Sequence, residues 1–111
     1  MSKSEEYGIE FFKKDAPFGG TFYVAETANL YDRELTFHIS NCDKRITEIQ
    51  IEDLQKALEG EPIQEDWGEV LGSTLDIFPK EGTVQIGYMN RRIPITDFKK
   101  LLEEWLAFIQ S

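Results

Sequence analysis

The sequence has few of the residues from which crosslinks are built, with one cysteine and four prolines in 111 residues. A single cysteine cannot form a disulfide within the chain, which favours a reducing compartment, so we expect a cytoplasmic protein. No apolar run approaches the roughly 18 residues of a membrane-spanning helix, and the first residues lack the apolar stretch of a signal peptide. We therefore expect neither a disulfide scaffold nor contact with a membrane.

Recognisable catalytic patterns are also missing. One histidine and one cysteine cannot supply a usual zinc ligand set, and neither a phosphate-binding GxxxxGK[ST] nor a G-x-S-x-G motif occurs. Cys42 has no second histidine to act as its base, and His38 is expected on the wet face of a strand or packed in the interior. The sequence predicts no enzyme activity, no cofactor and no metal.

Basic charge is scarce, because 12 Lys and Arg residues stand against 21 Asp and Glu residues and give a net charge of −9. This balance disfavours nucleic acid as a partner, and Arg91 and Arg92 beside Tyr88 are better read as a solvated turn. The excess is local: residues 48–76 hold nine acidic residues and one basic residue, whereas the rest of the chain holds 12 acidic and 11 basic residues. Such a segment is either a solvated face or a surface that attracts a basic partner.

The hydrophobic fraction of 41% supports a folded core. Periodicity predicts strands over 7–11, 21–26, 34–40, 74–78 and 83–89, a short helix over 53–58 that Gly60 ends, and a C-terminal helix capped by Thr96. We expect a single α+β domain over residues 1–111, in which a mainly antiparallel sheet packs against a C-terminal amphipathic helix and one shorter helix. Residues 1–6 are expected to form a flexible tail.

An internal repeat is a second possibility. Residues 49–59 align without gaps on residues 93–103, and both copies read I-x-I-x-D-apolar-x-K-x-L-E. The match suggests duplicated strand-strand-helix units around 21–60 and 73–110. The alternative is that any strand leading into a capped helix produces this pattern.

The acidic segment contains a predicted loop over residues 61–72 that holds an aromatic residue. Trp67 is either a binding anchor of the kind enriched at interface hot spots or a core residue folded under the loop. The charge distribution makes the surrounding carboxylates candidates for partner contact, with Trp67 as the possible anchor: Glu59, Glu61, Glu65, Asp66 and Glu69.

In size, charge and lack of catalytic motifs, the whole chain resembles bacterial immunity proteins, including those of contact-dependent growth inhibition. The resemblance implies a non-catalytic domain that binds and neutralises a toxin, in many cases a basic nuclease, through an acidic surface. The alternative is a cytosolic adaptor or regulatory module that binds another basic partner. A third possibility is a small-ligand site in an aromatic crevice formed by Tyr7, Phe22, Tyr23 and Trp105.

Overall fold

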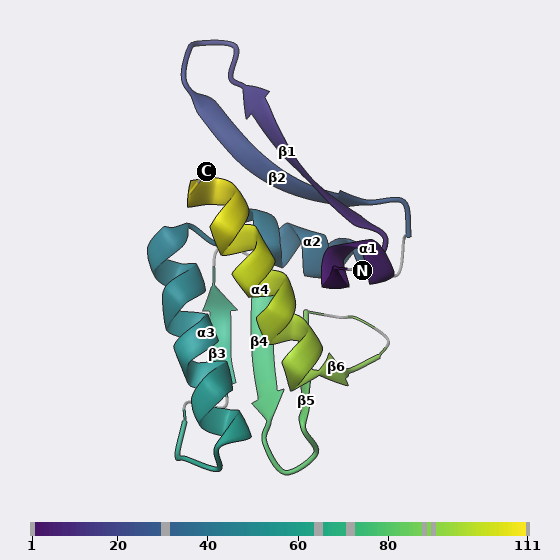
Figure 1. The fold of residues 1–111 in the computed structure, drawn as a ribbon, viewed down its shortest axis with the longest axis vertical. Coiled ribbons are helices and arrows are strands. Elements are labelled where there is room, and N and C mark those ends of the chain that lie inside the picture. Colours follow the sequence, from purple (N-terminus) through teal and green to yellow (C-terminus); the bar gives the residue numbers. More distant parts are fainter. Residues whose placement is uncertain are drawn as a thin grey trace.

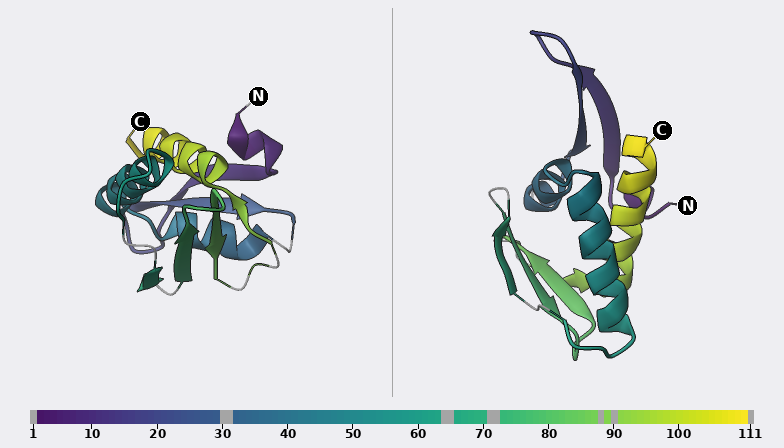
Figure 2. Two further views of the ribbon diagram at one scale, coloured as in Figure 1. Left: turned by 90° about the horizontal axis from the view of Figure 1, so that it is seen from below. Right: turned by 90° about the vertical axis from the view of Figure 1, so that its left-hand side faces the viewer.

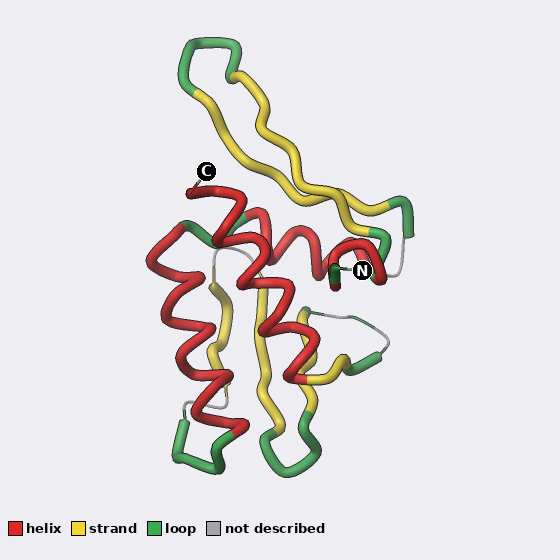
Figure 3. Tube along the Cα trace, in the orientation of Figure 1, coloured by secondary structure: helices red, strands yellow, loops and turns green. Residues whose placement is uncertain are grey.

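The computed structural model describes residues 2–29, 32–63, 66–70, 73–87, 89 and 91–110, with the backbone alone described for 66–70 and 73. The described chain forms an α+β fold with two antiparallel sheets, of strand order β1-β2 and β3-β4-β5-β6 (Figures 1 and 3). The helices are α1 (Lys3–Glu6), α2 (Arg33–Ser40), α3 (Lys44–Leu58) and α4 (Ile95–Gln110), and the strands are β1 (Ile9–Asp15), β2 (Thr21–Thr27), β3 (Asp66–Val70), β4 (Ser73–Phe78), β5 (Thr83–Ile86) and β6 (Ile93–Pro94).

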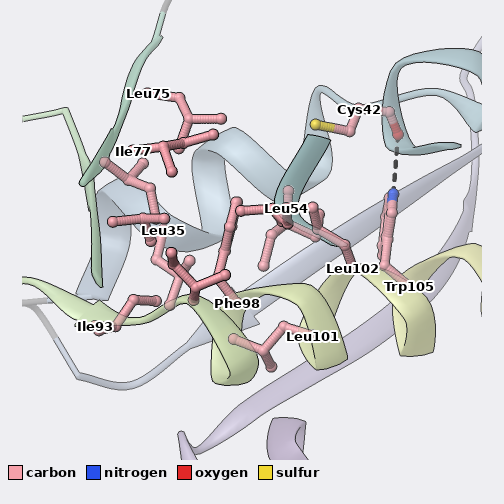
Figure 4. Close-up of a cluster of buried hydrophobic side chains, with 14 of the residues drawn as sticks. Leu35, Cys42, Leu54, Leu75, Ile77, Ile93, Phe98, Leu101, Leu102 and Trp105 are labelled. Atoms are coloured by element: carbon pink, nitrogen blue, oxygen red, sulfur yellow. Dashed lines mark hydrogen bonds between the residues drawn. The ribbon is translucent and has the colours of Figure 1, made fainter. Parts of the chain in front are cut away.

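The main core lies between the four-stranded sheet and the helices. Figure 2 shows α3 and α4 side by side across one face of this sheet. Alternate residues of the predicted hairpin β4–β5 point into the core, and Leu75, Ile77, Val84 and Ile86 are at most 1% exposed. On this side they meet the buried Phe98 of α4 (Figure 4). Each such side chain stabilises the fold by roughly 1.5–3 kcal/mol, so this interface anchors the domain.

The C-terminal helix follows the predicted apolar stripe. Phe98, Leu102 and Trp105 are buried, and Phe108 and Ile109 pack against the core. The predicted cap is wrong, because α4 begins at Ile95 and Thr96 lies inside its first turn. Ile95 instead continues directly from strand β6, and its backbone N–H donates to the carbonyl of Gly82. The helix is thereby fixed to the end of the β4–β5 hairpin.

Residues 34–40 form a helix, so the predicted strand is wrong. In α2 the buried side chains are Leu35, Thr36, His38 and Ile39, which follow the spacing of one helical face. Phe37, which alternation placed with Leu35 and Ile39, is instead 51% exposed. The alternation of apolar residues was therefore accidental, because two of the polar residues are buried and the central aromatic residue is not.

Helix α3 is longer than the helix predicted over 53–58, because it begins nine residues earlier, at Lys44. Its N-cap is Asp43, whose side chain accepts a 2.8 Å hydrogen bond from the backbone N–H of Ile46. It ends at Leu58, where the predicted helix also ends, and Gly60 follows the C-cap Glu59 with a φ of 79° that suits glycine. Residues 49–59 are thus almost wholly helical, whereas residues 93–94 form a strand. The first proposed unit, 21–60, is strand-helix-helix, so the two segments do not share one structure.

The start of the chain also differs from the expected tail. Lys3–Glu6 form the short helix α1, capped by Ser2. The backbone N–H groups of Lys3 and Ser4 donate to the carboxylate of Glu104 in α4, at 2.8 and 3.2 Å. These charge-assisted contacts attach α1 to the opposite end of the sequence.

The β1–β2 hairpin extends beyond the end of α4 (Figures 1 and 2). Strand β1 continues to Asp15, four residues beyond the strand predicted over 7–11, and β2 agrees with its prediction to within one residue. The inner face of the hairpin packs on α4 through aromatic contacts, with ring centroids of Phe11 and Trp105 5.2 Å apart and those of Tyr23 and Phe108 5.7 Å apart. The base of the hairpin is therefore part of the core, and its tip is not.

Candidate protein-binding surface

The acidic segment contains a strand where a loop was predicted. Residues 66–70 form β3, the edge strand of the four-stranded sheet, which pairs with β4 in the register Glu69↔Thr74 and Val70↔Ser73. An irregularity separates this pairing from Asp66↔Asp76. Five residues that contain two acids and a glycine show little of the apolar alternation that identifies a strand, because pairing with β4 supplies the stability.

Four of the six predicted contact residues lie in or beside this strand. Glu65 is outside the described residues, as are the side chains of Asp66, Trp67 and Glu69. Their roles as contacts, and the choice between a core and an interface position for Trp67, stay predictions.

The remaining two, Glu59 and Glu61, are exposed and flank the turn at Gly60. Together with Glu48 and Glu52 of α3, they line a groove of about 460 Å³ between α3 and α4. We call Glu48, Glu52, Glu59 and Glu61 the acidic groove. Sequence reasoning had found the charge excess but placed its centre in residues 61–69. The helical period of α3 would have shown that Glu48 and Glu52 share a face.

The acidic groove is only partly neutralised by the chain itself. Lys56 lies 3.4 Å from Glu52, and Lys99 of α4 is engaged 3.2 Å from Glu103. Across the described residues, no basic side chain approaches Glu48, Glu59 or Glu61 within 4.0 Å. Lys56 and Lys99 also line the groove, so four carboxylates face two ammonium groups and the groove keeps a net charge of −2.

Apolar groups accompany this charge on α3. Ile49 is 41% exposed and Leu58 is 43% exposed on the same helix. Asp53, between them, is partly buried, and desolvation raises its pKa while Lys56 opposes the shift. A rigid helix that carries both apolar side chains and carboxylates has the composition of an interface with a polar rim.

The two residues considered for catalysis lie elsewhere, in the interior. His38 is 1% exposed, which makes its predicted wet-face position wrong, and its Nε2 lies 3.0 Å from Oε1 of Gln50. Burial lowers the pKa of His38, since the imidazolium would be desolvated. Cys42 is 3% exposed, and burial raises the pKa of its thiol to about 12. A thiol in this environment stays protonated at neutral pH and is a poor nucleophile.

The aromatic crevice considered for a small ligand is not assembled as expected. Phe22, Tyr23 and Trp105 line an open groove of about 810 Å³, but Tyr7 is not among its lining residues. The Tyr7 hydroxyl instead donates a 2.7 Å hydrogen bond to Asp97 at the start of α4.

The two arginines considered for nucleic-acid contact are engaged within the chain. Nη2 of Arg91 contacts both carboxylate oxygens of the buried Asp32, at 3.0 and 3.1 Å. Arg92 lies over the ring of Phe78, 3.8 Å from its centroid, and pairs with Glu81. Tyr88 falls outside the described residues. Both guanidinium groups thus have partners within the chain.

Comparison of the chain with known proteins adds no functional information, so the function is inferred from the surface. No family model, curated protein or solved structure matches the chain. In the part of the chain that is described, no group of three or more His, Cys, Asp or Glu side chains could hold a metal ion. None of the helices described here is both long and apolar enough to cross a membrane.

Proposed function

We propose that this chain is a non-catalytic protein-binding domain, an immunity protein that binds and neutralises a basic toxin domain of the nuclease type. The observation that supports this proposal is the acidic groove, in which Glu48, Glu59 and Glu61 lack basic partners among the described residues. A nuclease cleft concentrates positive charge to attract phosphates, and the same field attracts carboxylates.

The position of the carboxylates on a helix strengthens the argument. Glu48 and Glu52 are four residues apart on α3, so they lie on one helical face. The helix is fixed by buried residues, of which Thr47, Gln50 and Leu54 are at most 1% exposed. Carboxylates on such a support lose less conformational freedom on binding than carboxylates on a loop, which leaves more of the electrostatic attraction as affinity.

The proposal assigns partner contact to the acidic groove first, with the exposed Ile49 as an apolar contact beside it. The proposal keeps Asp66, Trp67 and Glu69 as further contacts, on strand β3 at the edge of the sheet, which lies behind α3 in Figure 1. A cytosolic adaptor that binds another basic protein would use the same groove. The two functions differ in whether the partner is toxic.

The experiment uses the protein encoded beside this chain, because immunity proteins are encoded with their toxins. We expect its expression alone to arrest growth, its co-expression with this chain to restore growth, and the purified pair to bind with an affinity that falls as salt rises. A toxic neighbour that this chain neither binds nor neutralises would contradict the immunity proposal. A non-toxic neighbour that binds through the groove would favour the adaptor.

A further inference from the structure

The β1–β2 hairpin has one edge that is covered and one that is open. Ser40 of α2 covers the edge of β2, since its Oγ accepts a 2.8 Å hydrogen bond from the backbone N–H of Ala25 and lies 3.2 Å from the Ala25 carbonyl. The backbone groups of Ala25 therefore point away from β1. Because hydrogen-bonded and non-hydrogen-bonded pairs alternate in an antiparallel ladder, the same holds for its partner Phe11.

This alternation identifies the groups on the open edge of β1. Phe11 and, two residues further, Lys13 direct their N–H and C=O groups away from β2. None of these four groups has a hydrogen-bond partner among the described residues. The side chain of Phe11 packs on α4, and beyond it Lys13, Lys14 and Asp15 are exposed, in the part of the hairpin that extends from the body (Figures 1 and 2). An open edge of this kind is a template for another strand.

The sequence of β1 is complementary to itself when two copies run antiparallel. With Phe12 opposite Phe12 of a second copy, Glu10 faces Lys14 and Phe11 faces Lys13. Phe11 and Lys13 are the residues whose backbone groups point outward, so this register also forms the backbone ladder. Moving the centre of symmetry to Lys13 would place two lysines opposite each other, and moving it to Phe11 would lose both Glu–Lys pairs.

Within the hairpin, the carboxylate of Glu10 has no basic partner among the described residues. Glu10 and Glu26 lie opposite each other in the β1–β2 register, an unfavourable arrangement of like charges. Lys14 reaches Glu26 at 2.7 Å. Lys14 of a second copy would arrive opposite Glu10. Each dimer would contain this pair twice.

We propose that two copies of this chain pair through the open edges of β1, in the register centred on Phe12, and form one continuous four-stranded sheet. A two-fold axis relates the two copies and uses the β1 edge of each, so the contact produces a dimer and does not extend into a polymer. The two Phe12 rings meet at a non-hydrogen-bonded position, where opposite side chains are closest. The acidic groove lies on other elements and is not part of this contact.

The decisive test is a charge swap measured by sedimentation equilibrium. We expect the wild type to show twice the monomer mass of 12.9 kDa, and E10K and K14E each to shift strongly towards the monomer, since each places like charges at both pairs. An equimolar mixture of E10K and K14E should again form dimers, because both pairs then join opposite charges. The control E5K lies in α1, changes the net charge by the same +2 as E10K, and should remain dimeric. A wild type that stays monomeric at the highest soluble concentration, or a mixture that fails to recover dimers, overturns the proposal.

A backbone variant tests the edge itself. Lys13→Pro removes an N–H that points away from β2 and leaves the bonds within the hairpin in place, so the circular dichroism spectrum should persist while dimers are lost. Lys13→Ala keeps the N–H and should remain dimeric. A folded K13P variant with the dimer mass would exclude pairing through this edge.

Discussion

The indole Nε1–H of Trp105 donates a 2.9 Å hydrogen bond to the backbone carbonyl of Cys42, which joins α4 to the turn between α2 and α3 (Figure 4). Trp105 is 1% exposed and also meets the ring of Phe11. One side chain therefore connects the two helical segments with the β1–β2 hairpin. The turn at Cys42 is held by a tertiary contact 63 residues away in the sequence.

Trp105→Ala should lower the free energy of unfolding by about 3–5 kcal/mol, because it removes buried surface, leaves a cavity and leaves the Cys42 carbonyl without a donor. Trp105→Phe should cost less, since it keeps most of the apolar volume. Urea titration followed by circular dichroism measures both. An unchanged midpoint in W105A would contradict the position of this side chain in the core.

Stability should depend on pH through His38. Burial lowers the pKa of the folded imidazole below its ordinary value of 6.5, so between the two pKa values the unfolded chain binds one more proton. The free energy of unfolding should therefore be constant above about pH 7 and fall as the pH drops below 6.5, by up to about 1.4 kcal/mol per pH unit. His38→Gln should lose this dependence below about pH 6.5. Equal slopes in both proteins would show that His38 does not titrate on unfolding.

Replacing two carboxylates of the acidic groove with lysines should weaken partner binding more than the same change in net charge made elsewhere on the surface. E48K/E59K changes the net charge from −9 to −5, as does the control E5K/D15K, and all four residues are exposed. We expect the groove variant to lose more than tenfold in affinity for the basic domain encoded beside this chain, and the control to lose much less. Titration at two salt concentrations measures the difference. Equal losses would leave only the total charge as the cause.

Cys42 should be protected from alkylation in the folded protein. Its thiol is buried, and a pKa of about 12 leaves almost no thiolate at pH 8. Reaction with iodoacetamide, followed by mass spectrometry, should be at least a hundredfold slower in native buffer than in 6 M urea. Similar rates in the two conditions would show that the turn opens readily.

The elements that sequence analysis predicted correctly are those whose pattern is local. Helix α4 carries its apolar stripe over three turns, and the β4–β5 hairpin has alternating strands on either side of a turn at residues 79–82. The end of α3 could be placed because Gly60 adopts a conformation that suits glycine. In each case the residues themselves contain the information, whatever they pack against.

The errors occur where tertiary contacts decide. His38 is buried by contact with Gln50 and Phe98, from α3 and α4, and nothing in residues 34–40 reveals those partners. Strand β3 exists through pairing with β4. The groove could be foreseen as a charge excess but not located, because Glu48 and Glu52 join Glu59 and Glu61 only once α3 is recognised as one continuous helix.

The attachment of α1 to Glu104 and of the hairpin to Phe108 also affects synthesis on the ribosome. The amino-terminal helix and hairpin emerge first but pack on the helix that is translated about 100 residues later. At roughly 5–20 residues per second, they wait several seconds or more for that surface. During this interval the apolar side chains Phe11 and Tyr23 are unprotected, and they become candidates for capture by chaperones on the nascent chain.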